Sequence, residues 1–162
     1  MIDIFTTGGT IDKVYFDAKS EFQVGTPQIG ELLREANVTV EFSIHPLFRK
    51  DSLEMDDRDR AEIRRQVVAA DGGRIVITHG TDTMITTALA LVGIEGKTIV
   101  LTGSMQPARL RISDAVFNIG FAISAVQLLP EGVYIAMNGT LFDPRTSFKN
   151  VAENRFESKP MT

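Results

Sequence analysis

Five short apolar runs recur along the chain, each ending at or just before a glycine, hydroxyl, histidine or asparagine residue. They cover residues 2–6, 38–44, 74–78, 98–102 and 132–137. The third and fourth contain Ile75-Val76-Ile77 and Ile99-Val100-Leu101, which are unbroken and mostly β-branched. Runs of this kind are typical of strands buried on both faces, as in a parallel sheet covered by helices.

Helical patterns separate these runs. A short helix is predicted over 27–36, because proline at the first helical turn has no intrahelical N–H bond to lose. A longer one is predicted over 56–70, where Asp56 and Asp57 suit the positive end of the helix dipole. Two more are predicted over 83–92 and over 112–128, the latter stopping before Pro130. Strands alternating with helices predict an α/β fold with a doubly wound, mainly parallel sheet, in a three-layer α/β/α arrangement of the Rossmann or flavodoxin-like type.

Other stretches carry weaker signals. Residues 12–26 are polar without clear periodicity, and we interpret them as a loop or a hairpin. The tail after Lys149 is polar and has no strong core signal. Arg60, Arg64 and Arg65 are interpreted as a solvated helix face. The length of 162 residues predicts a single domain over 1–162, without a second domain.

Composition narrows the class of protein. The 17 basic and 21 acidic residues give a net charge of −4, which offers no electrostatic reason to bind nucleic acid or an anionic membrane. The absence of cysteine excludes disulfides and thiol catalysis, and with only His45 and His79 a histidine-rich metal site is not expected. No apolar run approaches the roughly 18 residues of a membrane span, and no secretory signal precedes the first strand. We therefore expect a cytoplasmic protein with a small-molecule partner and with no cofactor or metal.

Four loops are candidates for the chemistry, because ligands of open parallel sheets bind at the carboxyl ends of the strands. These loops span 6–11, 78–83, 102–107 and 138–143, and all contain glycine with small or hydroxyl residues. Such loops let backbone N–H groups approach a ligand, and their hydroxyls supply donors, acceptors or nucleophiles. Glycine and threonine are also ordinary turn residues and helix caps, so Thr81 or Asp82 is alternatively only a cap. The pattern alone does not separate an enzyme from a binding protein.

Nucleotide sites of two common kinds are disfavoured. Thr7-Gly8-Gly9-Thr10 lacks the Gly-Lys-Ser/Thr ending of a phosphate-binding P-loop. It also lacks the Gly-x-Gly-x-x-Gly spacing of a dinucleotide site.

Two of the loops resemble the signatures of the bacterial-type asparaginases. Thr7-Gly8-Gly9-Thr10-Ile11 is similar to the first signature, and Thr78-His79-Gly80-Thr81-Asp82-Thr83 to the second. Further similar positions follow in the family's order: Asp51-Ser52 with Met55, Thr102-Gly103-Ser104-Met105, Asp114 with Phe117-Asn118, Met137-Asn138, Asp143 with Arg145 and Lys149, and Phe156 with Ser158. The resemblance covers nearly the whole chain and implies the family's N-terminal domain.

The resemblance implies roles for individual residues. Thr10 stands where the family has the nucleophile that forms the acyl-enzyme, and Thr81, Asp82 and Lys149 stand at the second triad. Ser52 and Asp82 stand where the family holds the substrate's α-carboxylate and α-amino groups. The remaining substrate-binding positions it implies are Gly9, Asp51, Gly80, Thr81, Ser104 and Met105.

The chemistry of these residue types suits an acyl transfer. A threonine hydroxyl is a poor nucleophile until a neighbour removes its proton. Lys149 would do so as a neutral base, or as a cation it would orient Thr81 and stabilise developing negative charge, and both roles stay open. Backbone N–H groups of residues 9–10 or 80–82 are candidate oxyanion donors.

The chain also departs from the family pattern. Phe22 aligns with the family's flexible-loop tyrosine, so Tyr15, earlier in the same stretch, is the candidate replacement. Leu53 follows Ser52 where many members have a polar residue. Members are about twice as long, and a residue from the second domain of a neighbouring subunit completes their site.

Two classes of function follow from this resemblance. The first is an amidohydrolase that converts asparagine or a related small amide to aspartate and ammonia through a threonine acyl-enzyme. The alternative is a weakly active or non-catalytic asparagine- or aspartate-binding regulatory module, or one subunit of a split amidase. A homo-oligomer, dimer or tetramer, is expected by resemblance.

Overall fold

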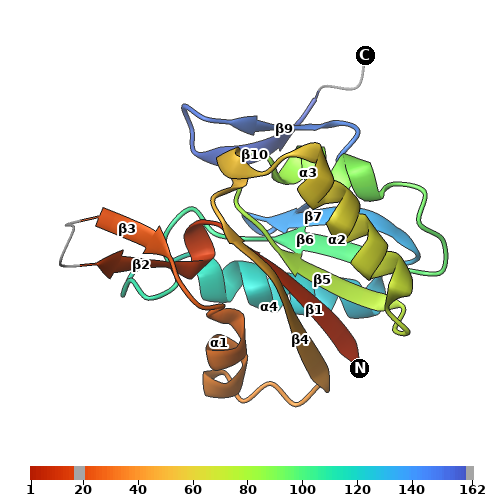
Figure 1. The fold of residues 1–162 in the computed structure, drawn as a ribbon, viewed down its shortest axis with the longest axis horizontal. Coiled ribbons are helices and arrows are strands. Elements are labelled where there is room, and N and C mark those ends of the chain that lie inside the picture. Colours follow the sequence, from red (N-terminus) through yellow and green to blue (C-terminus); the bar gives the residue numbers. More distant parts are fainter. Residues whose placement is uncertain (17–20, 160–162) are drawn as a thin grey trace.

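The computed structural model describes residues 1–16 and 21–159. Its elements in chain order are β1 (Ile2–Gly8), η1 (Thr10–Asp12), β2 (Lys13–Phe16), β3 (Glu21–Val24), α1 (Ile29–Glu35), β4 (Phe42–Lys50), η3 (Ser52–Glu54), α2 (Asp57–Ala69), β5 (Arg74–Thr78), α3 (Met84–Leu91), β6 (Thr98–Thr102), α4 (Ala115–Leu128), β7 (Gly132–Met137), β8 (Thr140–Phe142), β9 (Ser147–Asn150) and β10 (Arg155–Ser158). Figure 1 shows them as a layered α/β unit.

The main sheet has the order β4-β1-β5-β6-β7-β8. All neighbouring strands are parallel except β8, which runs antiparallel to β7. Counting only the parallel strands in chain order gives 2-1-3-4-5, the flavodoxin-like order, whose switch point lies between β1 and β5. The predicted doubly wound, mainly parallel sheet is confirmed.

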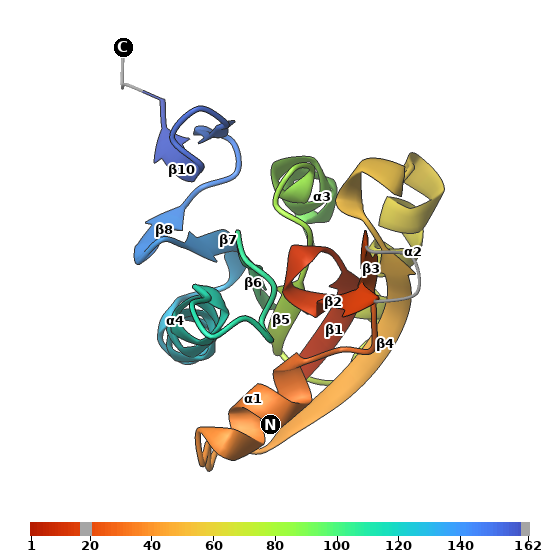
Figure 2. The same ribbon diagram turned by 90° about the vertical axis from the view of Figure 1, so that its left-hand side faces the viewer.

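Helices cover both faces of this sheet, which confirms the three-layer arrangement. Figure 2 shows α2 and α3 on one face and α1 and α4 on the other. Alternate residues of the central strands supply the two cores, since successive side chains point to opposite faces. Phe5 and Ile77 belong to the cluster under α2 and α3, whereas Ile4 and Val76 belong to the cluster under α1 and α4.

The strand predicted over 38–44 is corrected by β4, which begins at Phe42 and continues through Pro46 to Lys50. Proline is tolerated there because β4 is the edge strand next to β1 in the described sheet. Val38 and Val40 are apolar for another reason: they pack against the core as the chain leaves α1, after Asn37 adopts a left-handed φ of 51°.

The helix predicted over 112–128 begins only at Ala115. Ile112 is 85% exposed, so its apolar side chain reflects no buried helix face. The hydrogen bonds of Ser113 and Asp114 explain the later start. The Ser113 hydroxyl accepts the Ala115 N–H, and the Asp114 carboxylate accepts the N–H groups of Met105 and Gln106 instead of capping the helix.

The arginines of α2 are also corrected. Arg60 is only 9% exposed, and Arg64 donates to the carbonyl oxygens of Ala90 and Val92 at the end of α3. Arg65 alone matches the expected solvated face, paired with Glu62 at 2.6 Å. The helix start is as predicted, because Asp56 caps it by accepting from the N–H groups of Arg58 and Asp59.

Residues 12–26 contain a hairpin, which was one of the two interpretations of that stretch. β2 and β3 pair antiparallel, and the Gly25 N–H closes the base by donating to the Asp12 carbonyl at 2.8 Å. Residues 17–20 and 160–162 lie outside the described residues. Within the part of the chain that is described, no helix has the length and apolar character needed to span a bilayer.

Candidate active site

The loop after β1 presents Thr10 through a backbone that only glycine fits easily. Gly8 and Gly9 have φ values of 95° and 86°, in the left-handed region. The Gly9 N–H donates to the Lys50 carbonyl at 2.9 Å, which fixes the loop on β4. Thr10 then opens η1 and is partly buried.

The loop after β5 lies directly against it. A Cβ built on Gly9 would collide with the backbone nitrogen and Cα of Gly80. The Thr7 hydroxyl adds a bond across the same gap by donating to the Thr78 carbonyl at 2.9 Å. The two threonine loops therefore meet backbone to backbone at the switch point between β1 and β5, where the fold class places ligands.

Ser52 joins the same centre from a third loop. A Cβ on Gly80 would lie 2.6 Å from the Ser52 Oγ, so η3 also packs on the β5 loop. Ser52 is 1% exposed, and its hydroxyl has no hydrogen-bond partner among the described residues. A buried hydroxyl without a partner costs stability, and a ligand that bonds to it would recover part of that cost.

Lys149 reaches this centre from β9. Its Nζ donates to the Thr81 Oγ1 at 2.8 Å and to the Asp82 Oδ1 at 2.6 Å. The lysine side chain is only 14% exposed, so it is not a solvated surface residue. Because the Thr81 oxygen accepts from Lys149, the Thr81 proton is free to point at another acceptor.

The tail after Lys149 explains how the lysine is held, and the expectation that this tail lacks a core signal is wrong. Phe156 on β10 is 3% exposed and its ring lies 6.0 Å from that of Phe142. It pairs directly with Lys149 across the hairpin, and directly paired residues share one face of a sheet. Burying Phe156 therefore turns Lys149 toward Thr81 and Asp82.

His79 shapes the second loop without facing the centre. It is fully buried, and this desolvation lowers its pKa to about 4. The neutral ring must carry its proton on Nδ1, which contacts the Gly80 carbonyl at 2.7 Å, because a carbonyl only accepts. Nε2 then accepts from the Thr87 hydroxyl at 2.8 Å. This agrees with its interpretation as a hydrogen-bonded structural residue.

The other predicted positions have local partners of their own. Asp51 accepts the Leu53 N–H and pairs with Lys13 at 2.7 Å. Ser104 donates to the Gln106 carbonyl, and Met105 packs against the core while its N–H is held by Asp114. Tyr15 lies on the β2–β3 hairpin and is 54% exposed.

Sequence reasoning assigned no role to three residues that hold these loops in place. Lys13 pairs with Asp51, Thr87 fixes His79, and Asn118 donates to the Gly103 carbonyl at 3.0 Å. Only Asn118 left a signal, since its spacing of four residues from Asp114 puts both on one helix face, where they bond at 2.9 Å.

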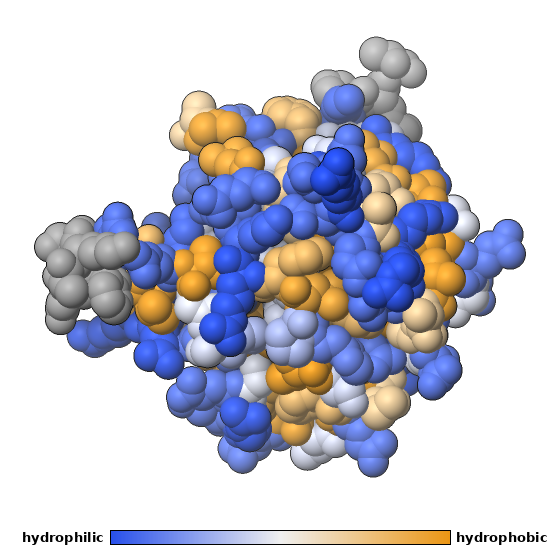
Figure 3. Space-filling model, viewed as in Figure 1, coloured by the Kyte–Doolittle hydropathy of each residue, from blue (hydrophilic) through white to orange (hydrophobic). Residues whose placement is uncertain are grey.

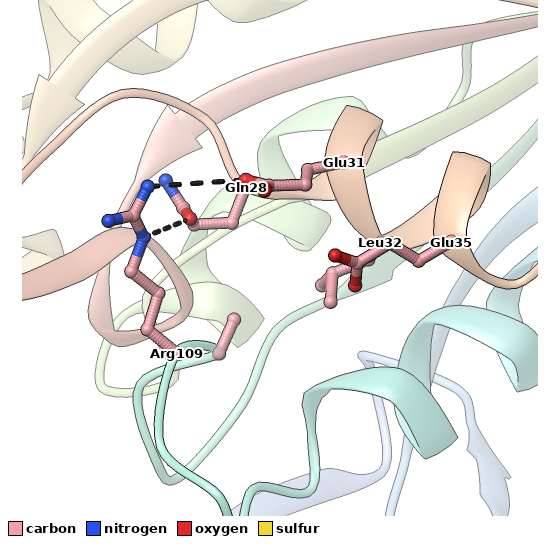
Figure 4. A pocket seen from close by; sticks show the side chains of 6 residues that line it. Gln28, Glu31, Leu32, Glu35 and Arg109 are labelled. Carbon is pink, nitrogen blue, oxygen red and sulfur yellow. Dashed lines mark hydrogen bonds and ion pairs between the residues drawn. The ribbon is translucent and has the colours of Figure 1, made fainter.

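A cleft of about 330 Å³ lies beside the centre, between α1 and residues 108–109. Figure 4 shows the Arg109 guanidinium facing Gln28 and Glu31, with Glu35 across the cleft. Gln28 connects it to the threonine loop, since its side chain accepts from Arg109 at 2.7 Å and its N–H donates to the Asp12 carboxylate at 2.8 Å. None of the predicted site residues lines this cleft.

Comparison with known proteins adds family evidence to this geometry. A family model described as "Asparaginase, N-terminal" matches residues 1–161. The glutaminase-asparaginase of Acinetobacter glutaminasificans is 33% identical over 91% of the chain and 49% of its own length. One subunit of the glutamyl-tRNA(Gln) amidotransferase of Methanococcus vannielii is 32% identical over 88% of the chain and 35% of its own length.

Solved structures agree with this relationship. The crystal structure of L-asparaginase I from Vibrio cholerae superposes with a TM-score of 0.86 at 28% identity, over 99% of the chain and 52% of that protein. The chain thus spans about half the length of the asparaginases it matches. Among the described residues, no group of three or more His, Cys, Asp or Glu is arranged to hold a metal ion.

Proposed function

The chain belongs to the asparaginase family, and from that premise we propose that it is an amidohydrolase that releases ammonia from asparagine or a related small amide. The observation that carries the proposal is the bridge of Lys149 between Thr81 and Asp82, at 2.8 and 2.6 Å, beside the loop of Thr10. A lysine, a threonine and an aspartate joined in this way next to a second threonine form a proton-transfer set for acyl transfer.

In the proposed reaction the Thr10 oxygen attacks the side-chain amide carbon and forms an ester, while the C–N bond breaks and ammonia leaves. Water then hydrolyses the ester, giving the acid and restoring the Thr10 hydroxyl. The Thr81 hydroxyl, whose oxygen accepts from Lys149, would relay the proton: it gives its own proton to the leaving nitrogen and takes up the proton that Thr10 loses. The paired Lys149 contributes positive charge beside the developing oxyanion.

Ser52 and Asp82 would hold the substrate at its α-carboxylate and α-amino end, away from the side-chain amide. The unpartnered hydroxyl of Ser52 supports a bond to the substrate's α-carboxylate. The Asp82 side chain is 44% exposed, so its carboxylate is open to the α-amino group while one oxygen pairs with Lys149. Backbone N–H groups of residues 9–10 and 80–82 remain the proposed oxyanion donors.

Tyr15 is proposed to assist Thr10 from the hairpin. It pairs across the hairpin with Phe22, and their rings lie 5.5 Å apart. The hydroxyl absent from the position of Phe22 is therefore present on the neighbouring strand. We expect Tyr15→Phe to lower kcat by about 100-fold, the lower end for loss of a proton-transfer group.

The test is ammonia release from asparagine, glutamine and peptide amides. Thr10→Ala and Thr81→Ala should each abolish release, whereas Thr86→Ala, on an exposed face of α3, should leave it unchanged. Equal rates from the wild type and Thr10→Ala would reject the proposal. Light scattering in the same preparations would test the proposed homo-oligomer.

A second candidate is the amidase component of a two-part enzyme. It is favoured by the 32% identity to one subunit of an amidotransferase over 88% of the chain. The purified chain would then bind aspartate, measured by calorimetry, yet release no ammonia alone. Steady turnover by the purified chain would reject this candidate, and with it the non-catalytic binding module.

A further inference from the structure

One ion pair joins the loop of the proposed nucleophile to the loop of the proposed substrate serine. Lys13 Nζ lies 2.7 Å from Asp51 Oδ2. Lys13 immediately follows η1, and its N–H donates to the Thr10 carbonyl. Asp51 immediately precedes Ser52. Each partner is thus within three residues of a group assigned to the reaction.

Asp51 also sets the conformation of η3. Its Oδ1 accepts the Leu53 N–H at 3.1 Å, and its own N–H donates to Glu54 at 3.2 Å, which closes a capping box. Lys13 holds the second carboxylate oxygen, and this contact lowers the pKa of Asp51. The residue that caps η3 is therefore the same residue that Lys13 contacts.

The position of η3 determines the position of Ser52, because Ser52 is closely packed on two sides. It packs against Gly80 on one side, and the Thr83 hydroxyl donates to its carbonyl at 2.8 Å on another. These contacts fix Ser52 relative to the loop of Thr81. Relative to the loop of Thr10, Ser52 is held by the backbone bond from Gly9 to the Lys50 carbonyl and by the side-chain contact between Lys13 and Asp51.

We propose that Lys13 is a positioning residue that sets the spacing between Thr10 and Ser52, and so sets substrate affinity more than turnover. The inference rests on the proposed function. Lys13 does not touch the reacting groups; it acts through Asp51. The pair is partly open to solvent, with side chains 27% and 30% exposed, so its effect is modest and depends on salt.

The kinetic test compares Lys13→Met, Lys13→Arg and the control Lys159→Met, an exposed lysine. Lys13→Met should raise KM for asparagine by about twofold to fivefold and change kcat by less than about twofold, because a partly exposed pair contributes little energy and none of it to the chemical step. Lys13→Arg should restore KM. The wild-type KM should rise with ionic strength, and that of Lys13→Met should not. A fall in kcat with unchanged KM, or no effect of Lys13→Met, would overturn the proposal.

A second measurement separates failure of this inference from failure of the proposed function. The Leu53 N–H, which bonds to Asp51, should exchange with solvent several-fold faster in Lys13→Met, and Lys13→Met should add nothing to the effect of Asp51→Asn. This readout needs no turnover, so it holds even if the wild type releases no ammonia. Independent, additive effects of the two substitutions on Leu53 exchange would overturn the inference.

Discussion

Asp12 is a buried carboxyl two residues after Thr10, at the base of the β2–β3 hairpin. It is 2% exposed; one oxygen accepts the Gln28 N–H and the other has no partner among the described residues. Burial disfavours the charged form and raises its pKa to about 7. At neutral pH this carboxyl lies near the midpoint of its titration.

This raised pKa predicts a pH-dependent stability. The folded state holds the Asp12 proton up to about pH 7, whereas the unfolded state loses it near 3.8. The stabilisation is therefore complete below pH 3.8 and is lost as pH rises to about 7, amounting to about 4 kcal/mol. Asp12→Asn should remove this dependence and exceed the wild type in stability at pH 8, as measured by urea unfolding across pH 4–8. Parallel stability curves for the two proteins would contradict it.

Gly9 offers a prediction about the contact between the two threonine loops. Gly9→Ala would place a methyl group against Gly80 in a backbone with a φ of 86°. We expect about 1–3 kcal/mol of destabilisation from this strain and at least a tenfold loss of ammonia release, because the loops of Thr10 and Thr81 must separate.

Gly93→Ala is the matched control for this prediction. Its φ of 85° is nearly the same, but nothing lies within 4 Å of the added carbon. Gly93→Ala should be destabilised by a similar amount, because its backbone is strained in the same way, and it should keep its activity. Equal activity losses in both variants would show that backbone strain, and not the contact with Gly80, is responsible.

At the scale of single residues, the residues of the motifs could be predicted from the sequence, but the contacts that hold them in place could not. Gly9, Gly80 and Lys149 could be identified because they belong to short motifs that follow one another in the order of the asparaginase family. Lys13 and Thr87 are ordinary residues whose importance depends on which distant atom they meet, Asp51 in one case and His79 in the other. One sequence contains no record of such pairings.

Among the elements, those with strong periodicity were predicted and those defined by tertiary contacts were not. β5 and β6 match their predicted bounds because an unbroken β-branched run has few alternatives. The bounds of β4 and the existence of β10 were not predicted, because β4 contains a proline and β10 is mostly polar. Pro46 is acceptable only at an edge, and Phe156 is the single core residue of its four-residue strand.

The β9–β10 hairpin is expected to couple stability to activity through Phe156. Phe156→Ala empties a site that is 3% exposed, so roughly 3 kcal/mol should be lost locally or globally. Lys149 should then lose its orientation, and kcat should fall while the rest of the sheet stays folded. Circular dichroism and ammonia release measure the two effects.

Phe148→Ala is the control within the same hairpin. Phe148 precedes Lys149 but is 37% exposed and points to the other face of the strand. It should cost under about 1 kcal/mol and leave kcat unchanged. If both phenylalanine variants lost activity equally, the hairpin as a whole, and not the burial of Phe156, would place Lys149.

Four of the proposed catalytic residues lie together within one copy of the chain. Figure 3 shows hydrophobic residues dispersed among hydrophilic ones on the face viewed, so no single large apolar patch dominates it. The four residues are Thr10, Thr81, Asp82 and Lys149, and the contacts that arrange them lie within the chain. In a homo-oligomer of this chain, these four residues are therefore expected to come from the same copy.

Mixing two inactive variants tests this self-containment. Thr10→Ala and Lys149→Met, unfolded together and refolded as a mixture, should recover no ammonia release, since every copy lacks one group of its own set. If the β9–β10 hairpin were instead exchanged between copies, half of the dimers would be mixed and one of their two sites intact, giving about a quarter of wild-type activity. Light scattering on the refolded mixture checks whether the copies have reassociated. Recovery near that level would mean that Lys149 acts on Thr81 and Asp82 of a second copy.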